Sequence, residues 1–160
     1  MSRCIPAGSQ LLATVGNLKF DGHRQRLAGF RDRIREAGFP MEDLVVAETF
    51  NDYETTFRVV TEAIDRYPRL RGIYMANLSV SGCAAAIEQA GKKGAICHDL
   101  NESVRQLLLR GSIDFTIPQN LRQQGYGPLI LLRDVLRRKA APDAARFNRQ
   151  IDIVCSDNLP

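Results

Sequence analysis

The chain has 160 residues, of which 44% are hydrophobic and 25% charged, and its formal net charge is +4 at pH 7. This length allows one domain with its own core, and the composition is that of a globular protein rather than a disordered or fibrous one. No apolar run approaches the roughly 20 residues of a membrane-spanning helix, and residues 1–10 lack the apolar segment of a signal peptide, so we expect a cytoplasmic protein with no membrane partner.

Short apolar runs alternate with amphipathic segments along the chain. The predicted strands are residues 11–15, 44–47, 72–76, 95–97, 113–117 and 151–154. Helices are predicted to begin at Asp21, at Asn51 (with Glu54 as a capping box), at Ser79 and after Asn101, and a long helix covers residues 122–138. Gly38, Pro68 and Gly91 are typical helix-ending residues.

Regular alternation of strand and helix with short connections predicts an α/β fold in three layers, a mostly parallel sheet with helices on both faces. Right-handed crossovers then bring the carboxyl ends of the strands to one edge of the sheet. Ligands of such sheets bind in the crevice outside that edge. We therefore expect the functional site there.

Polar and aromatic residues follow the predicted strands at that edge. They are Asn17, Phe50, Asn77, Asp99 and Gln119, with Arg26 on the first helix. Amides, a carboxylate and a guanidinium hydrogen-bond to vicinal hydroxyls, and an aromatic ring stacks on the apolar face of a sugar. This set predicts a binding site for a neutral polyol.

Each of these residues also has a structural interpretation. Arg26 suits the surface of an amphipathic helix, and Phe50 suits the core. Asn77 suits a turn before Ser79, and Asp99 suits the cap of the next helix in place of Asn101. The binding interpretation depends on all of them sharing one edge.

Six motifs resemble a known family in their order and spacing. They are Arg26-Leu-Ala-Gly-Phe30, the aromatic Phe50, Ala76-Asn77, His98-Asp99, Thr116-Ile-Pro-Gln119 with Gly125, and Ile151-Asp-Ile-Val with Asp157-Asn-Leu-Pro160. Together they resemble the effector-binding region of lac-repressor-family transcription regulators. That region shares its fold with periplasmic sugar-binding proteins.

The resemblance implies a role for each candidate residue. Arg26 would bind sugar hydroxyls or a carboxylate, and Phe50 would stack on the ligand. Asn77 would contact two hydroxyls, Asp99 would accept from them, and Gln119 would add a contact at the crossing between two lobes. Two residues depart from the family pattern. Leu78 follows Asn77 where an acidic residue is common, and His98 stands where Tyr or Phe is usual.

The sequence gives no support for catalysis, a metal or a cofactor. His98 and Asp99 are adjacent, but no nucleophile or metal-ligand pattern accompanies them. The four cysteines are widely spaced and form no Cys-x-x-Cys pair, so zinc binding and disulfides are not expected. We expect a binding protein rather than an enzyme.

The resemblance also predicts the organisation of the chain. Residues 11–160 correspond to the C-terminal lobe of the effector domain, residues 1–10 to a leader, and 120–140 to a helix that belongs to the N-terminal lobe. That lobe and the DNA-binding headpiece are not recognisable in the sequence. We expect weak sugar binding by this chain alone, and packing of helix 122–138 on its own lobe or on a second copy in a homodimer.

The leading hypothesis is therefore the sugar-effector half of a bacterial regulator that contacts DNA only through an absent N-terminal headpiece. A periplasmic sugar-binding receptor of an import system is the first alternative. A small α/β enzyme is a remote alternative, because no phosphate-binding loop is present.

Overall fold

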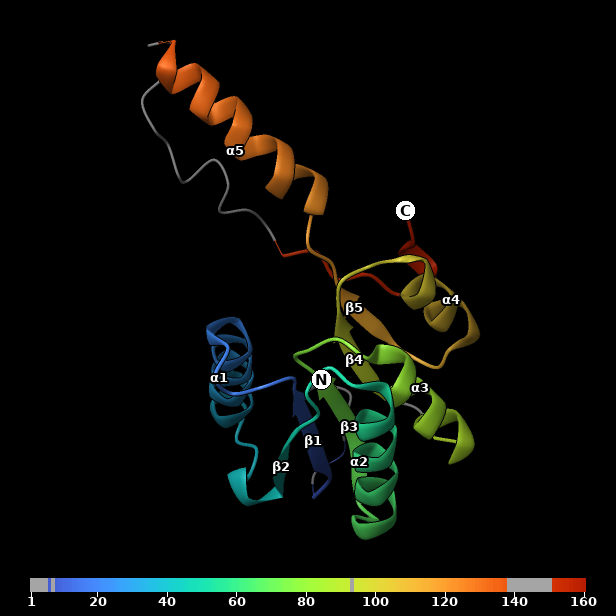
Figure 1. The fold of residues 1–160 in the computed structure, drawn as a ribbon. Helices are drawn as coiled ribbons and strands as arrows, with labels where there is room; N and C mark the ends of the chain where they lie inside the picture. Colours follow the sequence, from blue (N-terminus) through green and yellow to red (C-terminus); the bar gives the residue numbers. More distant parts are fainter. Residues whose placement is uncertain (1–5, 7, 93, 138–150) are drawn as a thin grey trace.

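The computed structural model describes residues 6, 8–92, 94–137 and 151–160, and its strands and helices alternate as predicted (Figure 1). The strands are β1 (Gln10–Val15), β2 (Leu44–Glu48), β3 (Leu70–Met75), β4 (Ala95–His98) and β5 (Phe115–Ile117). The helices are α1 (Asp21–Glu36), α2 (Tyr53–Arg66), α3 (Val80–Gln89), α4 (Glu102–Arg110) and α5 (Leu121–Leu136), with 3₁₀ turns η1 (Met41–Asp43) and η3 (Ser156–Asn158).

The five strands form one sheet in the order β2-β1-β3-β4-β5, and every neighbouring pair is parallel. Helices lie on both faces of this sheet (Figure 1). The predicted three-layer α/β fold is confirmed. Because all strands run the same way, the loops that follow β1 to β5 lie along one edge, called here the carboxyl edge.

Each face of the sheet has its own core. On one face, apolar residues of α2, α3 and α4 pack on strand residues such as Leu12, Ile73 and Cys97. On the other face, Leu27 and Phe30 of α1 pack on Ala13, Val15, Tyr74 and Ala76. Alternate residues of a buried strand point to opposite faces, so Ile73 packs in the first core and Tyr74 in the second. The strands are accordingly apolar runs rather than alternating patterns.

Three predicted elements differ from the structure, at the start of α2, at residues 151–154 and at the start of β5. The N-cap of α2 is Asp52, whose carboxylate accepts from the Thr55 amide at 2.8 Å; Asn51 precedes the helix, with φ of 58°. Residues 151–154 do not form a regular strand. Only Val154 pairs with the sheet, through an isolated antiparallel bridge to Thr116 with N–O distances of 2.8 and 2.9 Å.

The last strand also begins later than predicted. Gly111, with φ of 73°, ends α4, and the amides of Ser112 and Ile113 bond back to the Leu107 carbonyl at 3.0 and 3.4 Å. These two residues therefore close the helix instead of extending the strand. β5 begins at Phe115. The residue before it, Asp114, is hydrogen-bonded to Ala95 of β4: its amide donates to the Ala95 carbonyl, and its carboxylate accepts from the Ala95 amide.

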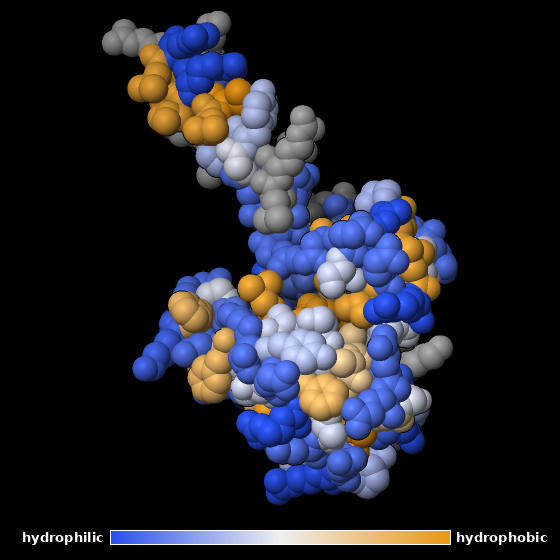
Figure 2. All heavy atoms as spheres, turned by 45° about the vertical axis from the view of Figure 1, so that its right-hand side comes forward, coloured by the Kyte–Doolittle hydropathy of each residue, from blue (hydrophilic) through white to orange (hydrophobic). Residues whose placement is uncertain are grey.

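Helix α5 extends away from the sheet and the other helices (Figure 1). Its side chains Tyr126, Leu129, Leu132 and Leu136 are between 56% and 73% exposed, and Figure 2 shows apolar side chains gathered on this helix at the top of the view. In the described part of the chain this helix does not pack on its own lobe, which was one of its two predicted placements. The other, packing on a second copy, stays a prediction. None of the helices in the described ranges is long and apolar enough to cross a membrane.

Candidate functional site

Backbone strain is concentrated at the carboxyl edge. Four non-glycine residues in the described part of the chain have positive φ, and all four follow a strand: Phe50, Asn51, Ser79 and Asp99. Bulky residues such as phenylalanine adopt this conformation only when the surrounding structure requires it. Such strained positions cluster at binding and active sites. The strained residues therefore lie at the edge where the sequence predicts the functional site.

Asn77 is buried at the end of β3, with 2% of its surface exposed. Its Oδ1 accepts from the Thr14 hydroxyl at 2.9 Å. Its Nδ2 donates to the Thr49 hydroxyl at 2.9 Å and to the Leu78 carbonyl at 2.8 Å. Both amide hydrogens are thus used inside the protein, and the side chain connects the ends of β1, β2 and β3. One acceptor position of Oδ1 remains.

Phe50 lies on the loop after β2 with 60% of its surface exposed and φ of 53°. Its amide donates to the Gly16 carbonyl at 2.7 Å, and the Thr49 amide donates to Val15 at 2.8 Å. These two bonds extend the β1–β2 pairing and fix the loop. The ring is therefore displayed at the edge rather than buried in the core.

Asn51 connects the neighbouring loops. Its Oδ1 accepts from the Leu78 amide at 3.2 Å and lies only 2.5 Å from where a Cβ on Gly16 would be. A Cβ at position 16 would therefore displace the side chains of Asn51 and His23. Asn51 therefore links the loop after β2 to the loop after β3 and does not form the predicted capping box with Glu54.

Asp99 and Gln119 meet at the ends of β4 and β5. Gln119 Nε2 donates to Asp99 Oδ1 at 2.7 Å, and both side chains are partly buried. The Asp99 amide and carbonyl bond to Ile117 and Thr116, at 3.0 and 2.5 Å. Asp99 is not the helix cap; Asn101 caps α4 by accepting from the Val104 amide at 2.9 Å. The second carboxylate oxygen of Asp99 has no partner in the described part of the chain.

Arg26 reaches the edge from α1. One of its guanidinium nitrogens donates to the Ala76 carbonyl at 3.2 Å, beside Asn77. It forms no salt bridge with any residue in the ranges described. The side chain is partly buried, so a cation with unused donors lies at the edge of the sheet.

The rings of Phe30, Tyr74 and His98 contact one another in sequence, and His98 lines the same cavity as Arg26. His98 Nε2 is hydrogen-bonded to the Tyr74 hydroxyl at 2.8 Å, and Phe30 stacks on Tyr74 with ring centroids 4.3 Å apart. Burial, and secondarily Arg26, lowers the pKa of His98 to about 4. Burial raises the pKa of Tyr74 to about 12. Both rings are therefore neutral at pH 7.

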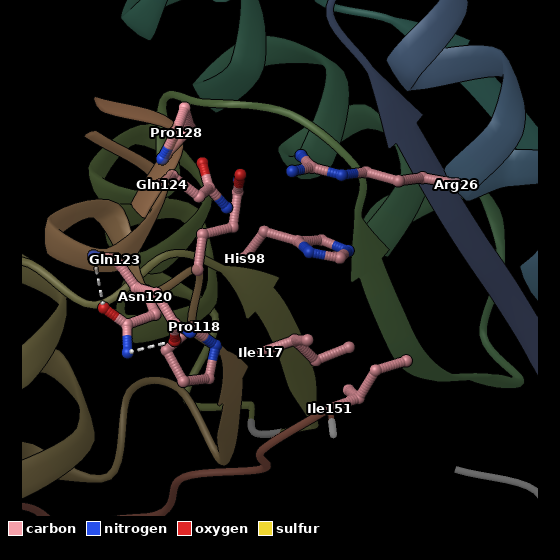
Figure 3. A pocket seen from close by; sticks show the side chains of 10 residues that line it. Arg26, His98, Ile117, Pro118, Asn120, Gln123, Gln124, Pro128 and Ile151 are labelled. Atoms are coloured by element: carbon pink, nitrogen blue, oxygen red, sulfur yellow. Dashed lines mark hydrogen bonds between the residues drawn. The ribbon is translucent and has the colours of Figure 1, made fainter. Parts of the chain in front are cut away.

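A cavity of about 490 Å³ opens between this part of the edge and the start of α5. Its lining includes Arg26, His98, Ile117, Gln119, Gln124 and Pro128. Figure 3 shows Arg26 and His98 on one wall with Gln124 and Pro128 opposite. Phe50, Asn77 and Asp99 lie outside the lining, so the cavity holds two of the five predicted site residues.

Sequence reasoning missed Tyr74, Gln123 and Gln124 as residues near the site. Tyr74 was hidden inside a predicted strand, where aromatic residues are common. The glutamines belong to α5, whose position no local pattern predicts. Among the described residues, no three His, Cys, Asp or Glu side chains form a cluster suited to a metal ion.

The sequence matches a family described as "Periplasmic binding protein domain" over residues 1–140. No curated protein gives a significant match. Many solved structures share the fold at low sequence identity.

Three of these structures illustrate the similarity. A periplasmic ribose ABC transporter protein from Conexibacter woesei has a TM-score of 0.84 at 16% identity, covering 98% of this chain and 53% of that one. A sugar ABC transporter sugar-binding protein from Bacillus halodurans has a TM-score of 0.77 at 23% identity, with coverage of 94% and 57%. An ABC transporter solute-binding protein from Agrobacterium vitis, bound to α-D-tagatopyranose, has a TM-score of 0.75 at 24% identity, with coverage of 94% and 51%.

The chain thus spans about half the length of the solved structures it resembles. The predicted fold, one lobe of a periplasmic-binding-protein-like structure, is confirmed.

Proposed function

The chain belongs to the periplasmic binding protein domain family, and we propose that it forms one wall of a cleft that binds a sugar or a related small polar molecule. The observation that carries this proposal is the presence of polar and aromatic groups along the carboxyl edge. Arg26, Asp99 and Gln119 are hydrogen-bonding groups held in place there, and the ring of Phe50 is exposed on the loop after β2 at the same edge. Hydrogen bonding together with stacking is suited to a polyhydroxy ligand.

Each residue has a distinct proposed role. Phe50 stacks on the apolar face of the sugar ring, since its own loop holds it exposed. Asp99 accepts from hydroxyls through its second oxygen, while Gln119 fixes the first. Arg26 donates through the nitrogens that Ala76 does not use. Asn77 supports the edge and offers one acceptor position to the ligand.

We propose that affinity in this chain is low, because one wall covers one side of a ligand. Binding sites that enclose most of a ligand's surface gain affinity from desolvation on all sides. The solved structures that resemble the chain are about twice as long. In this proposal the second wall of the cleft, which would also cover α5, is formed by residues other than these 160.

The test is a calorimetric screen of neutral and acidic monosaccharides against the folded chain and two variants. Asp99→Asn removes the charged acceptor and is expected to weaken binding roughly ten-fold or more, from the 1.5–3 kcal/mol of a charged hydrogen bond. Asp32→Asn is the matched control, since Asp32 is exposed and pairs with Arg35 on the outer surface of α1. Equal affinities for the two variants would refute the assigned role of Asp99.

Two biological uses of such a lobe are supported by different observations. The ordered motifs, including the ending Asp157-Asn-Leu-Pro160, favour the effector domain of a lac-repressor-family regulator, which would be cytoplasmic and dimeric and would bind DNA through a separate headpiece. The names of the similar solved structures favour a sugar receptor of an import system. The gene sequence upstream of the Met1 codon distinguishes them, because a helix-turn-helix indicates the regulator and a signal peptide the receptor.

We also propose that α5 is covered in the intact protein by the other lobe, and in this chain alone by a second copy. Four large apolar side chains on α5 are more than half exposed. Contact with water at those positions costs on the order of 1.5–3 kcal/mol for each side chain that ought to be buried. Light scattering is expected to give the mass of a dimer, and Leu129→Glu with Leu132→Glu is expected to give a monomer. A wild-type monomer at high micromolar concentration would contradict this.

A further inference from the structure

We propose that His98 is a specificity-determining residue of this site, and that its Nδ1–H, fixed by the buried Tyr74 hydroxyl, donates a hydrogen bond to an oxygen of the ligand in the cavity beside α5. The proposal rests on the proposed function and deepens it, because it names a ligand group that the site requires. None of the contacts proposed above uses His98, although this residue departs from the pattern of the similar regulators.

The His98 ring lies between the core and the cavity. It is 9% exposed, and it lines the cavity together with Arg26 (Figure 3). Its Nε2 is 2.8 Å from the Tyr74 hydroxyl, and the two rings meet edge to face with centroids 5.6 Å apart. Tyr74 is 6% exposed and stacks on Phe30 of α1. One nitrogen of the imidazole is therefore held by the core.

The other ring nitrogen, Nδ1, is accessible to a ligand. No hydrogen bond to it is formed within the described part of the chain, where His98 bonds through Nε2. The same residues contain no fully buried side-chain nitrogen or oxygen without a partner. Nδ1 therefore has accessible surface, and the open space that the ring lines is the cavity. Water satisfies such an atom in the free protein, and a ligand atom can take the place of that water.

The Tyr74 hydroxyl determines which nitrogen carries the proton. Burial lowers the pKa of His98 to about 4 and raises that of Tyr74 to about 12, so at pH 7 the imidazole has one N–H and the phenol keeps its O–H. If Nε2 donated to the hydroxyl, the hydroxyl hydrogen would have no acceptor in the described part of the chain, which is costly for a buried group. The hydroxyl therefore donates to Nε2, and the proton lies on Nδ1.

The charged groups near His98 do not accept this proton. Asp99 is the next residue, but its carboxylate lies outside the lining of the cavity and accepts from Gln119 at 2.7 Å. Arg26 lines the cavity and is itself a donor, with one nitrogen bonded to the Ala76 carbonyl. An oxygen of the ligand is therefore the acceptor that the Nδ1–H can meet in the cavity.

A donor fixed in this way discriminates between ligands. The Nδ1–H cannot become an acceptor without breaking the bond between Nε2 and the Tyr74 hydroxyl. A ring oxygen, a carbonyl oxygen or a hydroxyl at this position accepts the hydrogen bond, whereas a methylene leaves the N–H desolvated and unpaired. The cavity volume of about 490 Å³ is within the range of small-molecule sites.

The first measurement needs no ligand. Long-range proton–nitrogen correlation NMR of the imidazole, in the folded full chain at pH 7, distinguishes the two tautomers. We expect Nδ1–H in the wild type and a larger share of Nε2–H in Tyr74→Phe, which keeps the ring on Phe30 and loses the hydroxyl. Tyr67→Phe, at the far end of α2, is the control and should leave the tautomer unchanged. An Nε2–H tautomer in the wild type would overturn the proposal.

The second measurement combines ligand analogues with variants of His98. Calorimetry and NMR titration compare glucose, galactose and ribose with analogues in which one hydroxyl is removed or the ring oxygen is replaced by methylene. For a sugar that binds, one analogue should bind the wild type roughly five-fold or more weakly. That ratio should fall below about two-fold in His98→Phe, which keeps a ring without an N–H. His98→Asn, whose amide lies near the position of Nδ1, should restore part of it. Amide NMR spectra establish that each variant is folded.

The outcomes separate this inference from the function on which it rests. If sugars bind and every analogue loses the same factor in His98→Phe as in the wild type, His98 is a packing residue, and the inference fails while sugar binding stands. An unchanged tautomer in Tyr74→Phe would also overturn the inference and leave sugar binding intact. No binding of any sugar at millimolar concentration would overturn both, whichever tautomer is found.

Discussion

Replacing Asn77 by leucine should destabilise the fold strongly, although Asn77 is at the edge where a ligand residue was expected. The side chain is 2% exposed and bonds to the hydroxyls of Thr14 and Thr49, both fully buried. Leucine has a similar volume, so the substitution removes hydrogen bonds without leaving a large cavity. Its main effect is to leave two buried hydroxyls without partners.

The magnitude follows from those two hydroxyls. Each buried polar group without a partner costs about 1–3 kcal/mol. The Leu78 carbonyl adds little, because Leu78 is 57% exposed and water can replace the amide. Asn77→Leu should therefore lower the free energy of unfolding by about 2–4 kcal/mol. That is a large part of the roughly 5–15 kcal/mol of a typical domain.

Urea unfolding of four proteins tests this explanation: the wild type, Asn77→Leu, Thr14→Val and the double variant. Thr14→Val should destabilise the wild type by about 1 kcal/mol, because it removes the donor to Asn77 Oδ1. In the Asn77→Leu background the same change should stabilise the protein, because it removes an unpaired hydroxyl. A loss below about 0.5 kcal/mol in Asn77→Leu, or the same sign for Thr14→Val in both backgrounds, would refute the explanation.

Two further predictions concern glycine positions and pH. Gly82→Ala should destabilise the protein by about 1–3 kcal/mol, since a Cβ there lies 2.6 Å from the Tyr53 carbonyl oxygen. Gly29→Ala on α1 meets no atom within 4 Å and should stabilise by up to about 1 kcal/mol, so equal effects in urea unfolding would contradict the packing argument. Folding lowers the pKa of His98 from 6.5 to about 4, so on acidification the unfolded chain binds a proton before the folded chain does. The stability that the neutral imidazole contributes above pH 6.5 should therefore be lost as the pH falls toward 4, by at most about 3 kcal/mol. His98→Phe should flatten this part of the stability curve, and an unchanged pH slope would contradict it.

The strands, helices and caps were predicted well where they depend on residues close together in the sequence. Strands buried on both faces are continuous apolar runs, as in Leu12–Ala13 of β1 and the run around Ile73 and Tyr74. Helices between them have the periodicity of a partly buried helix. Asn101 was correctly predicted to cap α4, because the capping bond lies within four residues. The mostly parallel sheet then follows from the alternation of strand and helix.

The misassigned residues depend on partners distant in sequence. Asn51 and Asp52 are both good capping residues, but the Asn51 side chain accepts from the Leu78 amide, a partner 27 residues away, and Asp52 caps the helix. Residues 151–154 are apolar enough for a strand, but only Val154 reaches β5. No local pattern contains that information.

The candidate site was predictable in position but less so in detail. The carboxyl edge follows from the parallel sheet, and Asp99 and Gln119 meet there. The burial of Asn77 was not predictable, because it depends on hydroxyls 63 and 28 residues away. The cavity beside α5 was not predicted, because it lies between elements whose relative position is set by tertiary structure.

The most direct test of the central claim is an amide NMR titration of the labelled chain with the tightest-binding sugar of the screen. If the carboxyl edge is a ligand wall, shifts should be concentrated in the loops after the strands, at Phe50, Leu78, Asp99 and Gln119, and should be lost in Asp99→Asn. Shifts concentrated at the opposite edge of the sheet, or no shifts with any sugar at millimolar concentration, would contradict the claim.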